Sequence, residues 1–205
     1  MLAVIMAGGL GTRLQKGEKA LVQIAGATMV TWIVSAFTNA GHTVLVVTTP
    51  DTPYTSNYCR AHTIETFRSM GHGYLPDLIE TIVAIEEKEA FFAVAVDLPC
   101  ITSDLIQIIE DNYRMSGNDA CSVWVPVYLY NKLGIDPPVS YIEEIDAVPA
   151  CPAGINILRG DKIHQEQNEL KLVLNDKRLI FNINNPEILV KSEIFLLNNT
   201  GKINF

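Results

Sequence analysis

The sequence has few of the features that mark metal-clustered, secreted or membrane proteins. Its four cysteines are widely spaced and form no CxxC pair. This spacing predicts structural thiols in a reducing compartment and disfavours a zinc site or a disulfide framework. No apolar run reaches the length of a membrane span, and the densest, Phe91 to Val96, stops at Asp97. No basic segment precedes the first apolar stretch, so no signal peptide is predicted and we expect a cytoplasmic protein without membrane contact.

Positive charge is scarce as well. The 205 residues include 15 Lys and Arg against 23 Asp and Glu, a formal net charge of −8 at pH 7. A chain with this balance is not expected to bind nucleic acid, and an anionic substrate would need a local cationic site. The histidines are scattered and no GxSxG motif is present, so hydrolysis by an activated serine has no support.

What the chain does contain is a glycine-rich turn directly after an apolar run. Leu2 to Met6 reads as a short buried strand, and Gly8, Gly9 and Gly11 follow it. Glycines let backbone N–H groups approach an anion without obstruction by a Cβ atom. Three cations then follow within seven positions: Arg13, Lys16 and Lys19. This arrangement suits a polyphosphate, although an ordinary glycine-rich turn with surface cations is the alternative.

Two better-known phosphate motifs are excluded. A dinucleotide fingerprint needs a third glycine where Leu14 stands, and a P-loop needs Gly-Lys followed by Ser or Thr, which occurs nowhere in the chain.

The same segment carries a family resemblance. Ala7-Gly8-Gly9-Leu10-Gly11-Thr12-Arg13-Leu14, with Lys19 after it, resembles the signature of the nucleotidyltransferase superfamily that includes sugar-nucleotide and molybdopterin guanylyltransferases. Those enzymes transfer a nucleoside monophosphate from an NTP to a phosphorylated acceptor and release pyrophosphate. The resemblance implies a GT-A-like fold and a loop that wraps the NTP phosphates. It also implies that Arg13 and Lys19 are catalytic and offset charge during transfer.

The rest of the chain alternates between predicted strands and helices. Thr28 can cap a helix that continues to Phe37, and Gly41 ends it before a buried strand at Thr43–Thr48. Strand, helix and strand in this order indicate a right-handed βαβ unit and a parallel sheet. Further strands are predicted at 64–67, 91–96, 120–127 and 179–183, and further helices at 54–59, 76–87, 103 onward and 186 onward.

The later segments complete this prediction. Ser103 is expected to cap the helix that follows it, with Leu105, Ile108 and Ile109 buried, and Asn185 to cap the last helix. The stretch 128–152 reads as an excursion outside the core. The expected fold is α/β: a single three-layer α/β/α domain over residues 1–205 with a mostly parallel, Rossmann-like sheet.

Asp97 is the second candidate for chemistry. It directly follows the apolar strand 91–96, so it should emerge at the carboxyl end of the sheet, where open α/β folds bind ligands. An acid there can hold Mg²⁺ and leave metal positions for phosphate and water. The alternative is an aspartate that merely ends a strand beside Pro99. The superfamily resemblance implies that Asp97 is a metal ligand.

Two asparagines near the C-terminus are further candidates. Phe181 to Glu187 resembles, loosely, a stretch of the guanylyltransferase branch, and Asn182 and Asn184 share one face if the segment is a strand. Either carboxamide could complete a metal site or bind the acceptor. Turn-forming asparagine is the alternative.

A glycine-flanked helix start is the candidate for base recognition. Gly73, Tyr74 and Asp77 lie there, and its N–H groups could contact an anion or a base edge. Asp77 could accept hydrogen bonds from guanine N1–H and N2–H₂, or could simply serve the helix dipole. The stretch from Thr48 to Thr52, at the end of a strand, is another candidate for the wall of a base pocket.

The segment Pro152 to Asn156 narrows the resemblance. Together with the two preceding segments it resembles archaeal GTP:adenosylcobinamide-phosphate guanylyltransferases over nearly the whole chain. This likeness implies GTP and adenosylcobinamide phosphate as substrates, Mg²⁺ as cofactor, a homodimer, and Gly154 and Asn156 beside the cleft. A molybdopterin or sugar-phosphate nucleotidyltransferase is the alternative, and a non-catalytic nucleotide sensor is the second.

Overall fold

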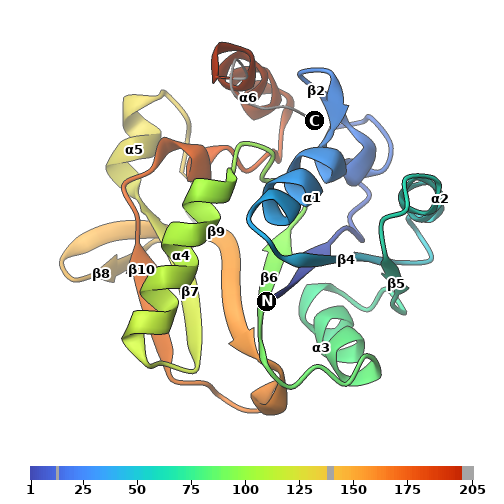
Figure 1. Cartoon of the computed structure of the whole chain (residues 1–205). Helices are drawn as coiled ribbons and strands as arrows, with labels where there is room; N and C mark the ends of the chain where they lie inside the picture. The colour runs from blue at the N-terminus through green and yellow to red at the C-terminus, as the bar shows by residue number, and fades with distance from the viewer. Residues whose placement is uncertain (13, 138–140, 200–205) are drawn as a thin grey trace.

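A mixed sheet forms the centre of the protein in the computed structural model, which describes residues 1–12, 14–137 and 141–199 (Figure 1). Within these residues the sheet has eight strands, in the order β10-β7-β9-β6-β1-β4-β5 with β8 paired to β9. They are β1 (Leu2–Met6), β4 (Thr43–Thr48), β5 (Thr66–Arg68), β6 (Ala90–Ala95), β7 (Ala120–Pro126), β8 (Glu143–Ile145), β9 (Val148–Arg159) and β10 (Glu169–Val173). β9 runs antiparallel to β6 and β7, whereas β1–β4, β1–β6, β4–β5 and β7–β10 are parallel pairs. The prediction of a mostly parallel sheet is confirmed.

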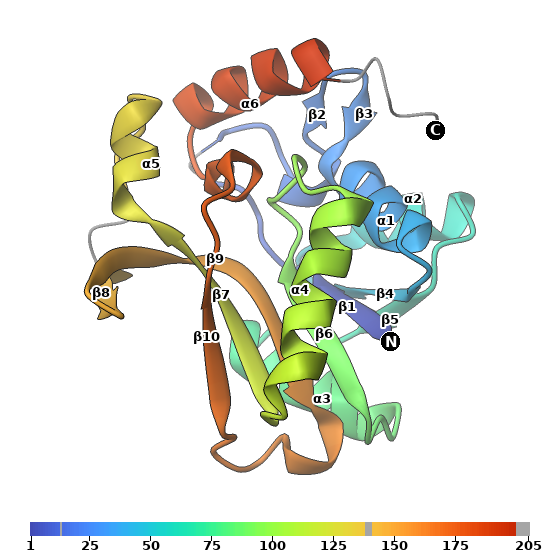
Figure 2. The ribbon, with the colours of Figure 1, turned by 60° about the vertical axis from the view of Figure 1, so that its left-hand side comes forward.

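Helices cover both faces of this sheet (Figure 2). They are α1 (Met29–Asn39), α2 (Pro53–Ala61), α3 (Tyr74–Ala84), α4 (Ser103–Ser116), α5 (Val127–Lys132) and α6 (Pro186–Asn199), with short 3₁₀ turns η1 (Lys19–Leu21), η3 (Gly160–Lys162) and η4 (Lys177–Ile180) and a small hairpin, β2 (Gln23–Ile24) and β3 (Ala27–Thr28). Side chains alternate along a strand, so Ala3 and Ile5 pack in the cluster that contains α1 and α4, while Val4 and Met6 pack against α3. Burial on both sides explains why β1 is apolar throughout. The three-layer prediction is confirmed.

The two helix caps predicted at Thr28 and Asn185 are present. Thr28 Oγ1 accepts a hydrogen bond from Thr31 N at 3.2 Å, and Asn185 Oδ1 accepts one from Ile188 N at 2.9 Å. Each satisfies an N–H group that the first turn of a helix leaves without a partner.

Other local predictions were wrong by a few residues. Ser103 is the first residue of α4 rather than its cap, a position that Thr102 occupies. Ile108 is 43% exposed, and Ile106 takes the buried position on α4 instead. β5 spans Thr66–Arg68 instead of 64–67, and α3 begins at Tyr74 rather than 76.

Two larger predictions were wrong. Residues 179–183 are not a strand: Leu179 and Ile180 are buried in the turn η4, and the late strand is β10, which the sequence analysis missed. Much of 128–152 also belongs to the fold, as α5, β8 and the start of β9. Prolines in this stretch suggested a loop, but Pro152 lies opposite Trp124 at a register shift between β7 and β9, where a missing N–H is tolerated.

The four cysteines are buried and unbridged, as expected for structural thiols. Burial raises the pKa of Cys59 to about 11 and that of Cys121 to about 12. Neither thiol is therefore a ready nucleophile at neutral pH.

No helix in the described part of the chain is long and apolar enough to span a bilayer.

Candidate active site

A cavity of about 360 Å³ opens at the carboxyl ends of β1, β4 and β6. Gly8, Gly9 and Lys19 contribute to one side, Asp97 follows β6, and the remaining wall includes Asp51 and Tyr74. The glycine-rich loop that follows β1 and the residue Asp97 that follows β6 meet there, because β1 and β6 are adjacent parallel strands. This is the edge at which open α/β sheets bind ligands.

Two glycines after β1 are required because neighbouring residues lie too close to leave room for a Cβ atom. A Cβ atom at Gly8 would stand 2.5 Å from Thr49 Cγ2, and one at Gly11, where φ is +59°, would stand 3.2 Å from Lys19 Cα. Lys19 N donates to Gly9 O at 3.1 Å, which closes the loop on itself. The loop therefore returns Lys19 to the point where it began, beside the cavity.

Lys19 is the centre of the polar contacts in this cavity. Its Nζ forms an ion pair with Asp97 Oδ2 and donates to Asn184 Oδ1 at 2.7 Å. Ile183 N donates to Asp97 O at 3.0 Å, so the asparagine segment is tied to the strand end by the backbone as well. Three predicted site residues from distant parts of the chain are thus brought together. Arg13, the other predicted catalytic cation, lies outside the described residues.

The oxygens around Lys19 are chemically suited to a hard cation. Asp97 Oδ1 is buried and has no hydrogen-bond partner among the described residues, while Asn184 Oδ1 faces the same ammonium group as Asp97 Oδ2. Asn182 is linked to Lys19 through Asn184, because Asn182 Oδ1 accepts a hydrogen bond from Asn184 Nδ2. Within the described ranges, no three His, Cys, Asp or Glu side chains gather as a metal cluster. The set fits Mg²⁺ held by one carboxylate together with substrate phosphates.

Asp77 does not face the cavity as a free acceptor. Its carboxylate accepts hydrogen bonds from Gly71 N at 3.0 Å, His72 N at 2.9 Å and Gly73 N at 3.3 Å, and the residue is 4% exposed. The N–H groups expected to contact an anion or a base edge are therefore already engaged. Asp77 stabilises the turn before α3, which favours its alternative, local role.

Tyr74 lies at the start of α3 and lines the cavity beside Gly73. Burial of its hydroxyl end, together with the charge of Asp97, raises the pKa of Tyr74 to about 12, although the residue as a whole is 45% exposed. The phenol therefore stays protonated at neutral pH and can donate a hydrogen bond.

Of the predicted wall 48–52, Thr49 and Asp51 line the cavity, whereas Thr48 and the predicted Asn156 are not among its described lining residues. Thr48 is fully buried and donates to Phe67 O at 3.4 Å, since alternation along β4 turns it inward. Asn156 lies in the middle of β9, in register with Ala93 and Ser122, away from the strand ends. Gly154 is closer to the site: a Cβ there would stand 3.6 Å from Asn182 Nδ2.

Asp51 lines the cavity two residues after Thr49, within the stretch 48–52 that was predicted as a possible wall of a base pocket. Glu18, which is buried directly before Lys19, was not predicted. The sequence did hold one signal for Glu18, since it is an acid directly before a predicted phosphate-binding lysine. A carboxylate that becomes buried at such a position needs specific hydrogen-bond donors.

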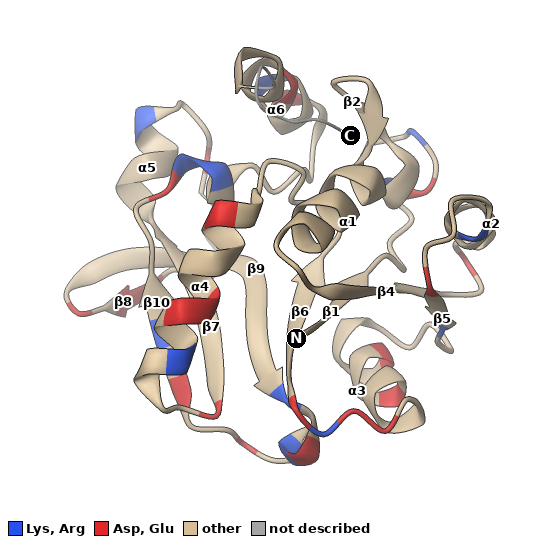
Figure 3. Cartoon of the chain, viewed as in Figure 1, with Lys and Arg blue, Asp and Glu red and all other residues tan. Residues whose placement is uncertain are grey.

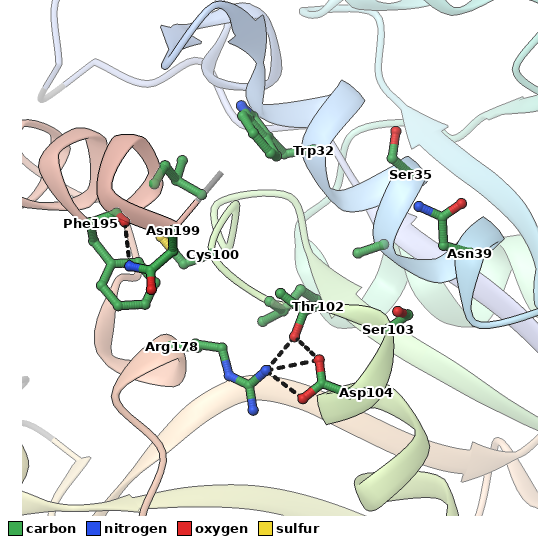
Figure 4. Close-up of a pocket in the computed structure, with 13 residues that line it drawn as sticks. Trp32, Ser35, Asn39, Cys100, Thr102, Ser103, Asp104, Arg178, Phe195 and Asn199 are labelled. Carbon is green, nitrogen blue, oxygen red and sulfur yellow. Dashed lines mark hydrogen bonds and ion pairs between the residues drawn. The ribbon is translucent and has the colours of Figure 1, made fainter. Parts of the chain in front are cut away.

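A larger cavity, about 690 Å³, lies between α1, α4 and α6 (Figure 4). Arg178 on its wall pairs with Asp104 at 2.7 Å and with Asp176 at 2.5 Å, and Figure 3 shows the cationic η4 beside the acidic first turn of α4. These contacts keep the pKa of Arg178 above its usual value and neutralise its charge within the protein. Among the described lining residues, Arg178 is thus held by two carboxylates, whereas Lys19 in the smaller cavity pairs with one.

The fold and the cavity at Lys19 define a nucleotidyltransferase-type α/β protein. The chain belongs to the family of the MobA-like NTP transferase domain, whose model matches residues 3–155. A relative named adenosylcobinamide-phosphate guanylyltransferase, from Methanocaldococcus jannaschii, is 30% identical over 207 aligned residues, which cover 96% of this chain and 97% of the relative.

Solved structures agree on the fold. A hypothetical transferase from Thermus thermophilus superposes with a TM-score of 0.71 at 14% identity, covering 92% of this chain and 98% of its own. Molybdopterin-guanine dinucleotide biosynthesis protein A from Archaeoglobus fulgidus gives a TM-score of 0.64 at 14% identity, covering 97% and 100%.

Proposed function

We propose that this protein is a guanylyltransferase that transfers GMP from GTP to adenosylcobinamide phosphate and releases pyrophosphate. The name of the Methanocaldococcus jannaschii relative supports both substrates, and the family membership supports transfer from an NTP. The observation that carries the proposal is the placement of Lys19, which lies beside the glycine loop and in contact with both Asp97 and Asn184.

The reaction needs positioning and charge neutralisation more than proton transfer. A phosphate oxygen of the acceptor attacks the α-phosphorus of GTP in line; the new O–P bond forms as the bond to pyrophosphate breaks. The attacking phosphate monoester is already ionised near neutral pH, so a general base is not required. Backbone N–H groups of residues 8–12 bind the triphosphate, and Lys19 offsets the charge that develops on it. Arg13 is proposed to do the same on the strength of the family signature.

Asp97 and Asn184 are the residues proposed to hold Mg²⁺, with Asn182 supporting Asn184. When bound, the ion supplies charge stabilisation to the phosphoryl oxygens. The support is Asp97 Oδ1, which has no partner in the part of the chain that the structure describes, and the convergence of carboxylate and amide oxygens on one ammonium group.

The product assay decides the function. We expect pyrophosphate release with GTP and adenosylcobinamide phosphate, and much less with molybdopterin or glucose 1-phosphate as acceptor. A larger rate with either of those acceptors would replace the proposed substrate. GTP binding by calorimetry without pyrophosphate release from any acceptor would support the nucleotide sensor.

Asp51 is proposed to select guanine in place of Asp77. It is exposed on the cavity wall, and within the described residues its carboxylate has no hydrogen-bond or ion-pair partner. A carboxylate can accept from both N1–H and N2–H₂ of guanine, a pair of donors that adenine lacks.

Asp51→Asn should lower kcat/KM for GTP by about tenfold to a hundredfold, the range for loss of a hydrogen bond to a charged group. The preference for GTP over ATP should fall with it. ITP lacks the 2-amino group, so the ratio of kcat/KM for GTP to kcat/KM for ITP should be smaller in the variant than in the wild type. Asp111→Asn, on the exposed side of α4, is the matched control. An unchanged GTP/ATP ratio would remove Asp51 from base recognition.

Residues 1–205 are further proposed to form one nucleotidyltransferase domain that acts in the cytoplasm as a homodimer. The continuous sheet supports the single domain. The dimer rests on the family resemblance, and analytical ultracentrifugation tests it.

A further inference from the structure

Glu18 links the loop that carries Lys19 to the start of a separate helix. The residue is 8% exposed, and its two carboxylate oxygens accept hydrogen bonds from Tyr54 N at 2.9 Å and Thr55 N at 2.5 Å. Both donors lie in the first turn of α2. The contact joins segments that are 36 and 37 positions apart in the chain.

Helix α2 has no cap of its own. Its N-cap residue, Thr52, makes no side-chain capping bond, and Thr52 Oγ1 instead accepts from Thr49 N at 2.9 Å. Pro53 occupies the first helical position, so the next N–H groups would otherwise lack partners. Glu18 therefore supplies the cap from outside the helix, with a negative charge that the helix dipole favours.

Both ends of this contact border the candidate active site. Lys19, the next residue after Glu18, reaches Asp97 and Asn184. On the other side, Thr49 and Asp51 line the cavity immediately before α2. Glu18 thus joins the phosphate side of the cavity to the wall formed by 49–52.

We propose that Glu18 is a positioning residue for nucleotidyl transfer, which holds Lys19 in place by capping α2. This inference rests on the proposed function. Glu18 itself does not line the cavity and acts through Lys19. A displacement of about 1 Å in a positioned group can cost about a hundredfold in rate, so a single buried contact of this kind can matter for turnover.

The test is a double-mutant cycle with Lys19. Glu18→Ala should lower kcat by about tenfold to a hundredfold in the wild-type background, with a smaller change in KM for GTP. In a Lys19→Ala background the same change should have almost no further effect on kcat, because the group that Glu18 positions is gone. A residue that only stabilised the fold would give the same relative loss in both backgrounds.

Milder variants keep the test valid if Glu18→Ala folds poorly. Glu18→Asp retains the charge on a shorter side chain and should recover part of kcat, whereas Glu18→Gln keeps the size but presents an amide to one N–H donor and should recover less. Hydrogen exchange at the Tyr54 and Thr55 amides should quicken in the order Asp, Gln, Ala. Glu166→Gln, at an exposed site, is the matched control and should change neither readout.

The outcomes separate this inference from the proposed function. An active wild type with equal losses in both backgrounds would overturn the role of Glu18 and leave guanylyl transfer intact. A wild type that transfers nothing to any acceptor would overturn both. Loss of kcat confined to the wild-type background, with faster exchange at the two amides, would support the proposal.

Discussion

Lys19→Ala is expected to lower kcat for guanylyl transfer by about a hundredfold to a thousandfold, the range for removal of one group that stabilises developing charge. Its ammonium group lies between Asp97 and Asn184 at the edge of the glycine loop. Charge builds on the transferring phosphoryl group mainly during the chemical step, so the interaction is stronger in the transition state than in bound GTP. The Kd for GTP should therefore change much less than kcat.

Two measurements check this expectation: steady-state pyrophosphate release and calorimetric titration with GTP. Lys88→Ala is the control, because it removes the same charge from an exposed connection at the opposite end of β6. Thermal unfolding of each variant separates lost catalysis from lost structure. Losses of equal size in kcat and in GTP affinity would show that Lys19 only binds the nucleotide.

Asp97→Asn should lower kcat by at least about a hundredfold, because metal-assisted charge stabilisation is worth several kcal/mol and each 1.36 kcal/mol is tenfold in rate. The substitution keeps the size and shape of the side chain but removes its charge. One carboxylate oxygen pairs with Lys19, and the other is buried without a partner within residues 1–12, 14–137 and 141–199, so the variant loses both the ion pair and the proposed ligand.

The dependence of GTP affinity on Mg²⁺ is the second readout for this variant. Wild-type affinity should rise as Mg²⁺ is added, and the rise should be smaller in Asp97→Asn. Asp111→Asn serves as the control because its carboxamide can still accept from Gln107. A variant that keeps wild-type kcat and the same Mg²⁺ dependence would exclude Asp97 as a metal ligand.

The sequence was reliable where structure depends on near neighbours. The strand at Leu2–Met6, the cap at Thr28 and the emergence of Asp97 at a strand end follow from periodicity and chain direction over a few residues. It was less reliable at the start of β9, where the prolines at the end of the stretch 128–152 suggested a loop. There the register shift against β7 accommodates what would otherwise break a strand.

The sequence by itself determined the glycine loop, the acid at the end of β6 and the three-layer fold, because each arises from local pattern and composition. Only the tertiary structure decided which polar groups remain free to meet a ligand. Asp77 is saturated by three N–H groups, Glu18 by the start of α2, and Asn184 meets Lys19 across 165 positions of chain. A carboxylate can bind a substrate only if its oxygens do not already accept hydrogen bonds from backbone N–H groups. Whether they do depends on which segments lie close together in space, and neighbours along the sequence do not determine this.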